Sequence, residues 1–117
     1  MTTFTESVRP LEWLRSEAPG TRSRSVGTMT VAGGAGHVSG TVVGRITASG
    51  KLVAYSNSAS DGSQAAVGIL VSDLKGQPNG DVQAVIVDAD CEVEAALLTG
   101  LDSAGRADLA LLGFKLR

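Results

Sequence analysis

The sequence is poor in the side chains that most often carry chemistry or fill large cores. Its 117 residues include four aromatic side chains, one cysteine and one histidine. A single cysteine excludes an intrachain disulfide framework. One cysteine with one histidine also excludes a zinc or transition-metal ligand set. Because aromatic residues are few, the core must consist mainly of valine, isoleucine, leucine and alanine. A core of small side chains is often supplemented by oligomerisation.

Long apolar runs and an excess of one charge are absent too. No apolar stretch approaches the roughly 18 residues that indicate a membrane-spanning helix. The net charge of −2 is spread over both signs, so we expect no nucleic-acid partner. The N-terminus, MTTFTESVRP, lacks the basic and apolar regions of a signal peptide. We therefore expect synthesis in the cytoplasm and no membrane partner.

Glycine, in contrast, is abundant, with 15 residues, and 43% of the chain is hydrophobic. This length supports one small domain. The many glycines favour a strand-rich fold with sharp bends. We predict a mostly β fold, with short helical segments near the N-terminus and the C-terminus.

Residues 1–25 differ in composition from the remainder. They hold two of the three prolines, the only tryptophan and four of the ten basic residues. A short helix is predicted over Pro10–Glu17, with Ser7 available as a cap and Pro10 tolerated in the first turn. We expect an extended arm over 1–25, too short to form its own core, and one β-rich domain over 26–117.

Short strands and turns are expected from Val26 onward. Thr41–Thr47 and Lys51–Tyr55 flank Ala48–Gly50, and a three-residue connection ending in glycine favours a bulged hairpin. Ala65–Ser72 is apolar enough for a buried strand, and Gln77–Gly80 is a strong turn signal.

The C-terminal third is predicted to contain a long strand, a helix and a final strand. Alternation over Val85–Val93 predicts one strand with apolar residues on one face. Asp102-Ser103 is expected to cap a helix that ends near Leu112, with Gly113 as its stop. Phe114–Arg117 then returns to the sheet.

The opposite face of the predicted strand carries Asp88, Asp90 and Glu92, and Glu94 extends the row. Neighbours at this spacing lie about 6.6–7 Å apart, too far to chelate one ion tightly or to share a proton. One interpretation is a solvated face. The other is a charged stripe that meets basic residues of a neighbouring subunit or shell protein.

No catalytic site is recognisable. His37 lies among glycines and valine without an orienting partner in the sequence, and Cys91 falls on the apolar face of its strand. The Gly-rich Ala32–Gly36 is not followed by the Lys-Ser/Thr of a phosphate loop. We therefore expect no enzyme activity, no cofactor, no metal and no small-molecule substrate.

One segment carries a family resemblance. VVGRITASGKLVAY, an SDG turn and AAVGIL, spanning Val42–Leu70, resemble the lambda-type phage head decoration proteins. LRSEAPGTRSR near the N-terminus and LLGFKLR at the C-terminus are also similar to that family. The resemblance implies a β-clip domain, a small barrel or bent ribbon, without enzymatic activity or cofactor.

The resemblance also implies a location and partners. Members form homotrimers on the three-fold positions of an expanded icosahedral shell, where they stabilise the virion against the pressure of the packaged genome. Their N-terminal arm, poorly ordered in the free trimer, engages the major capsid protein. In this chain Leu11, Trp13 and Leu14 are candidate anchors, with Arg22 and Arg24 as steering charges. The alternative, that Trp13 packs against its own domain, stays open.

Two rival functions remain from other classes. A trimeric β-clip nucleotide hydrolase needs metal-binding acids and a Gly-rich, arginine-bearing phosphate loop, and neither is recognisable here. A β interaction module of a phage tail or baseplate is the second rival.

Overall fold

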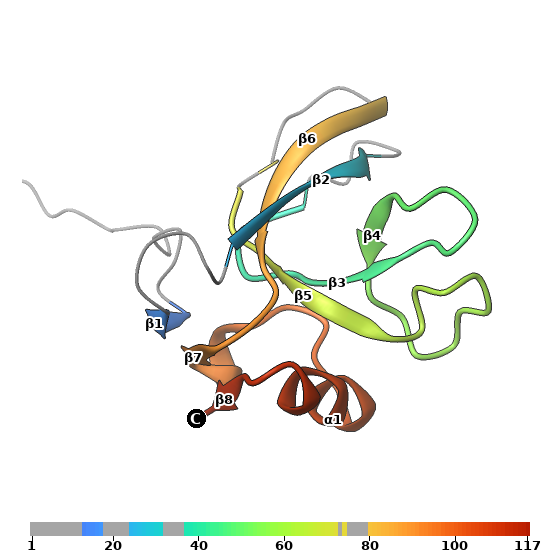
Figure 1. The fold of residues 1–117 in the computed structure, drawn as a ribbon. Helices are drawn as coiled ribbons and strands as arrows, with labels where there is room; N and C mark the ends of the chain where they lie inside the picture. Colours follow the sequence, from blue (N-terminus) through green and yellow to red (C-terminus); the bar gives the residue numbers. More distant parts are fainter. Residues whose placement is uncertain (1–12, 18–23, 32–36, 73, 75–79) are drawn as a thin grey trace, which may run out of the picture.

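The computed structural model describes residues 13–17, 24–31, 37–72, 74 and 80–117. These residues form a five-stranded closed barrel and, beside it, a three-stranded sheet accompanied by a helix (Figure 1). The barrel strands, in the order of their pairing, are β2 (Arg24–Val31), β4 (Leu52–Ala54), β3 (Val42–Arg45), β5 (Ala66–Leu70) and β6 (Gly80–Val87). The smaller sheet contains β1 (Leu14–Glu17), β7 (Cys91–Val93) and β8 (Lys115–Leu116). The helical elements are the short 3-10 helix η1 (Ala95–Leu97) and α1 (Ser103–Leu111).

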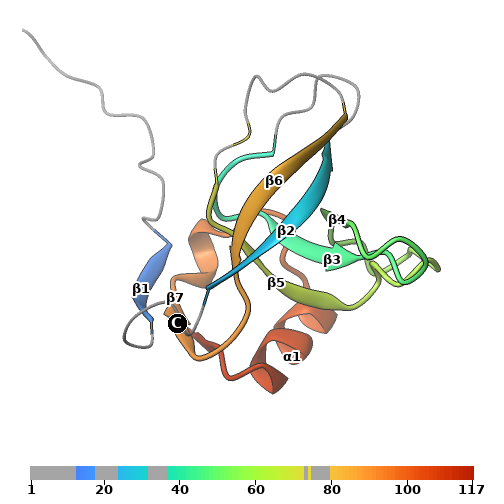
Figure 2. The ribbon, with the colours of Figure 1, turned by 45° about the horizontal axis from the view of Figure 1, so that its top comes forward.

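The barrel is built on its longest pair of strands. β2 and β6 run antiparallel along their whole length, from Arg24 opposite Val87 to Val31 opposite Gly80. Figure 2 shows this ribbon curving over one side of the barrel. The pairing that closes the barrel is much shorter, because β2 and β4 pair in parallel only where Met29 lies opposite Leu52.

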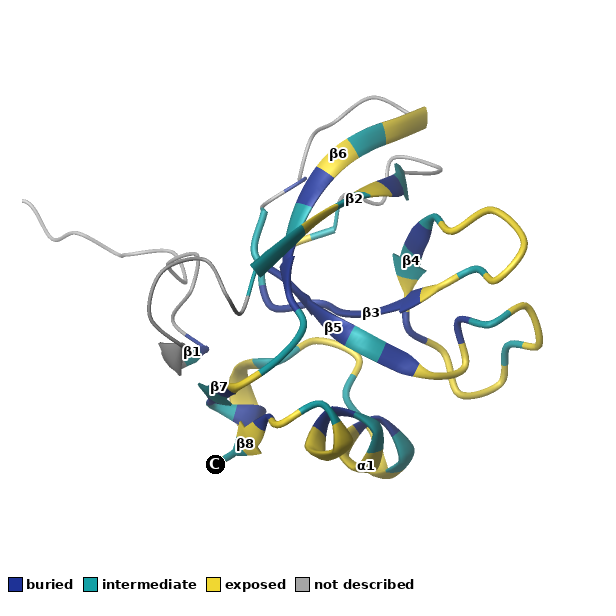
Figure 3. Cartoon of the chain, viewed as in Figure 1, coloured by how far each residue is buried: buried dark blue, intermediate teal, exposed yellow. Residues whose placement is uncertain are grey.

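Parts of three barrel strands, namely β3, β5 and the second half of β6, are buried on both faces, because adjacent residues of a strand point to opposite sides. Val43, Leu70 and Ile86 belong to the cluster inside the barrel. Their neighbours Val42, Ile69 and Val87 belong to a second cluster. It lies between the barrel and the elements drawn below it in Figure 1, which are the small sheet and α1 and are called the lower layer from here on. All six are at most 1% exposed, and Figure 3 shows the buried strands at the centre of the molecule. Consecutive apolar residues thus follow from a barrel covered on one side.

The predicted hairpin and buried strand are confirmed. β3 and β4 pair antiparallel, and between them Gly50 has φ of 72° and donates its N–H to the Ile46 carbonyl at 2.7 Å. Glycine is favoured there because left-handed backbone strains residues with a Cβ. β5 occupies most of the predicted Ala65–Ser72 strand. The Gln77–Gly80 turn lies outside the described residues, apart from Gly80.

The predicted C-terminal helix and final strand are also confirmed. Asp102 caps α1 by accepting the Gly105 N–H at 2.7 Å. Gly113 follows with φ of 91°, and β8 then joins β7 in parallel.

Two predicted elements are wrong. Leu14–Glu17 is strand β1 and not helix, because it pairs with β7; residues 10–12 lie outside the described part. The single strand over Val85–Val93 is broken after Val87. At Asp90 the backbone has φ of 50°, which interrupts a strand and which aspartate tolerates better than most residues.

Candidate functional site

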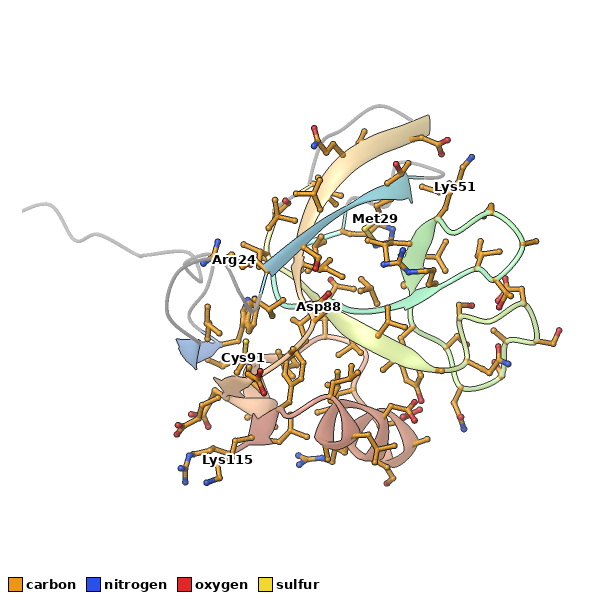
Figure 4. The ribbon with its side chains drawn as sticks, in the orientation of Figure 1. Arg24, Met29, Lys51, Asp88, Cys91 and Lys115 are labelled. Atoms are coloured by element: carbon orange, nitrogen blue, oxygen red, sulfur yellow. The ribbon has the colours of Figure 1, made fainter. Side chains whose placement is uncertain are left out.

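The predicted anchor residues that the structure describes belong to the body of the domain. Trp13 is 2% exposed and Leu14 is half-buried, and both pack in the cluster between the barrel and the lower layer. Arg24 is half-buried at the start of β2 (Figure 4). Leu11 and Arg22 lie outside the described residues. The alternative interpretation of Trp13, packing against its own domain, is therefore the one observed in this structure.

Trp13 occupies a close-fitting socket beside the segment that precedes β3. Its indole Nε1 donates to Ser39 Oγ at 3.1 Å, which satisfies the only polar atom of the buried ring. The Gly40 backbone lies so close that an added Cβ would come within 2.8 Å of the indole Cδ1. Gly40 also has φ of +96°, so both its conformation and the proximity of the ring favour glycine.

Backbone bonds hold the residues around Trp13 against β7. The Glu94 N–H donates to the Trp13 carbonyl at 2.6 Å. β1 pairs antiparallel with β7, where Leu14 lies opposite Val93 and Glu17 opposite Cys91. This placement makes β1 an edge strand of the sheet β1-β7-β8.

The acidic residues do not form one straight row, because the strand predicted to carry them is broken. Asp88 lies just after β6 and accepts from Ser25 Oγ at 2.5 Å (Figure 4). Asp90 is exposed in the turn, and its N–H donates to the Leu112 carbonyl at 3.3 Å. Glu92, on β7, forms an ion pair with Arg117. Glu94, which is half-buried, follows β7. At least two of these carboxylates thus have partners within the chain.

Cys91 and His37, the candidates for catalysis in the sequence, have structural contacts in the fold. Cys91 is 3% exposed, and its Sγ donates to the Ala89 carbonyl at 3.2 Å, which confirms the predicted burial. His37 is half-buried in a loop and accepts the Leu74 N–H on its carbonyl at 2.7 Å. Within the described ranges, no group of three or more His, Cys, Asp and Glu side chains is placed to hold a metal ion. No helix among those residues is long and apolar enough to cross a membrane.

A bridge that sequence analysis missed fixes α1 onto the barrel. Tyr55, which is 7% exposed, donates its hydroxyl to Asp102 Oδ1 at 2.8 Å, the same atom that caps the helix. Six residues further along the chain, Asp108 Oδ2 accepts the Ala66 N–H of β5 at 3.0 Å. The Asp102 cap was predicted, but its partner 47 residues away carried no local signal in the sequence.

The bridge shifts the pKa of both of its members. Burial, followed by the hydrogen bond to Asp102, raises the pKa of Tyr55 to about 12. The Gly105 N–H and then the Tyr55 hydroxyl hold the pKa of Asp102 below its usual value, because both donate to the carboxylate. The arrangement stabilises a charged carboxylate beside a neutral phenol, which is a structural role.

Several large apolar side chains remain on the surface of the described part. They are Val26 at 61% exposed, Val38 at 38%, Leu97 at 43% and Leu111 at 87%. On α1, Leu111 lies one turn after Ala107 and next to Ala110, both of which are also exposed. The sequence pattern does not distinguish these residues from buried ones, because only the fold decides which apolar side chains stay exposed.

Comparison with known proteins adds a family match. A family model described as Bacteriophage lambda head decoration protein D matches residues 3–114. None of the curated proteins compared with the chain matches it.

Proposed function

This chain belongs to the bacteriophage lambda head decoration protein D family, and from that premise we propose that it binds the expanded phage head as a homotrimer at three-fold positions and stabilises the shell against the pressure of the packaged genome. As a head decoration protein it binds the capsid on the surface of the virion, and its family is structural and not catalytic. The match over residues 3–114 is the observation that carries the proposal. It supports neither the tail-module alternative nor the nucleotide-hydrolase alternative.

Surface composition supports the trimer. Leu111 and Val26 are 87% and 61% exposed, and burial between subunits would remove such apolar area from water. The core is also built largely from aliphatic side chains, so association would add to its stability. Light scattering tests this part: we expect the mass of three chains, and a monomer that persists at micromolar concentrations would contradict it.

Attachment is proposed to depend on the N-terminal segment, residues 1–25. Leu11 supplies an apolar anchor in this proposal, while Arg22 and Arg24 steer the segment toward acidic capsid surface. Asp88, Asp90, Glu92 and Glu94 are proposed as charged contacts to a neighbouring subunit or to the shell. Three segments from one trimer would bind together, so their effective concentration makes attachment much tighter than any single contact.

The decisive experiment mixes purified protein with undecorated expanded shells and, separately, with unexpanded shells, and then sediments both. We expect the protein to pellet with the expanded shells only. The controls are protein without shells and shells without protein. Failure to pellet with expanded shells, at concentrations at which the decoration protein native to those shells saturates them, would contradict the proposal.

A further inference from the structure

Trp13 is tied to the domain by three kinds of interaction. Its ring is 2% exposed in the cluster beside the barrel, its indole N–H donates to Ser39 Oγ, and its carbonyl accepts the Glu94 N–H. Strand pairing with β7 continues the attachment as far as Glu17, opposite Cys91. Releasing this segment would expose a large aromatic surface and leave the Trp13 N–H and the β7 edge to find new partners.

We propose that Trp13 and β1 stay docked on β7 when the protein binds the shell, and that they position the residues upstream. In this inference Trp13 is a positioning residue and makes no contact with the capsid. The apolar capsid contacts of the proposed arm then come from residues before Trp13, within residues 1–12, while Arg22 and Arg24 keep their proposed steering role. The inference rests on the proposed function and assigns different roles to two parts of the arm.

The physical benefit of such an anchor is entropic. If shell binding has to position only the residues before an attachment point fixed at Trp13, and not all of 1–25, the conformational entropy lost on binding is smaller. Because β1 is already ordered on β7, binding does not have to supply the conformational entropy that ordering it would cost. An anchor of this kind increases affinity without contacting the partner.

The register of β1 offers a direct test through the natural Cys91. Residues directly opposite on antiparallel strands have Cα atoms about 4.5–5.5 Å apart, within the range that a disulfide spans. Because Glu17 lies opposite Cys91, Glu17→Cys should form an intrachain disulfide that locks β1 onto β7. Mass spectrometry and thiol titration would follow its formation, with Glu17→Ser treated identically as the matched control.

We expect the oxidised and reduced forms of Glu17→Cys to sediment with expanded shells as well as the Glu17→Ser control does. If the oxidised form loses binding and reduction restores it, β1 must leave β7 to engage the shell, and the inference is overturned. Failure of the disulfide to form under oxidising conditions would also count against it, because the docked register would then be absent in solution.

A second pair of variants separates positioning from direct contact. Trp13→Ala empties the socket, so β1 should detach more easily and the affinity for shells should fall on the order of tenfold. Combined with oxidised Glu17→Cys, the same substitution should regain most of that affinity, since the disulfide replaces the anchor. A direct capsid contact by Trp13 would not be rescued by a crosslink elsewhere, so absence of rescue refutes positioning.

Removal of residues 1–12 completes the test, because it leaves Trp13 and β1 in place. We expect this truncated protein to lose shell binding while its single tryptophan keeps the blue-shifted emission of a buried indole. Full binding by the truncated protein would overturn the inference. If instead the complete chain does not bind shells while the Glu17→Cys disulfide forms, the proposed function fails and the docking of β1 in the free protein stands.

Discussion

The inside of the barrel and the layer beneath it have cores of different kinds. The barrel interior is aliphatic, with Met29, Leu52 and Leu70 among its largest members. The cluster beneath contains every aromatic side chain in the described part of the chain: Trp13, Tyr55 and Phe114. Aliphatic side chains fill the narrow space between closely paired strands, whereas broad rings cover the gaps between a barrel, a helix and a small sheet.

The two regions also differ in what holds them together. Long backbone ladders join the barrel strands, most of all β2 and β6. In the lower layer β7 and β8 are three and two residues long, so their pairing supplies few hydrogen bonds. Side chains compensate, through the Tyr55–Asp102 bridge and the Trp13 socket. We therefore expect the barrel to unfold as one cooperative unit and the lower layer to unfold locally, without the barrel.

The largest effects should come from truncating one core residue in each region. Leu70→Ala in the barrel and Phe114→Ala beneath it should each cost about 2–5 kcal/mol, from lost burial and the cavity left behind. Hydrogen exchange should distinguish them: Leu70→Ala accelerates exchange throughout, and Phe114→Ala accelerates it mainly in β7 and β8. Leu97→Ala, at a 43% exposed position that the trimer proposal does not use, is the control for loss of a leucine side chain. Equal acceleration by both core variants would contradict the comparison.

A matched pair of glycines should show how closely the barrel backbone is packed. A Cβ on Gly44 would lie 2.5 Å from the Ser63 carbonyl oxygen, and backbone cannot move aside as a side chain can. Gly44→Ala should therefore cost about 3 kcal/mol. Gly50→Ala meets no atom within 4 Å and should cost only about 1 kcal/mol, for its left-handed backbone. Thermal unfolding measures both, and a Gly50 variant less stable than the Gly44 variant would refute the packing argument.

Loss of the bridge to α1 should have an intermediate effect. Tyr55→Phe keeps the buried ring but removes the hydroxyl that donates to Asp102, and should cost about 1 kcal/mol. Thr30→Val, which removes an exposed hydrogen bond to Asp81, is the control and should change stability by less than about 0.5 kcal/mol. Denaturant unfolding would compare them. No loss in Tyr55→Phe would show that the bridge does not stabilise α1.

The smallest effect at neutral pH, and the most specific, concerns the titration of Tyr55. Its pKa is raised to about 12 from an ordinary value of 10.0, so its contribution to stability is complete below pH 10 and is lost as the pH rises toward 12. Because the chain has one tyrosine, phenolate absorbance reports this group alone. Asp102→Asn should lower the midpoint, because it replaces the carboxylate that accepts the Tyr55 hydrogen bond and removes the negative charge beside it. Asp81→Asn should leave the midpoint unchanged. A midpoint near 10 in the native protein would contradict the buried bridge.

Local patterns predicted much of the fold, for physical reasons that particular residues illustrate. Asp102-Ser103 and Gly113 predict the two ends of α1, because capping and left-handed termination depend on neighbours a few residues away. Gly50 predicts the β3–β4 hairpin for the same reason. The N-terminal helix and the unbroken strand over Val85–Val93 were wrong, because pairing with β7 and the turn at Asp90 depend on contacts distant in sequence.

By itself, then, the sequence determined a strand-rich domain with an aliphatic core and, through Val42–Leu70, a resemblance to the family that the match over residues 3–114 shows. Only the tertiary structure decided where Trp13 lies. An apolar residue in a short N-terminal segment has the same local pattern whether it contacts a capsid or its own domain. The choice is made by a glycine, a serine and a strand edge more than 25 residues away, which come together only when the barrel and the lower sheet form.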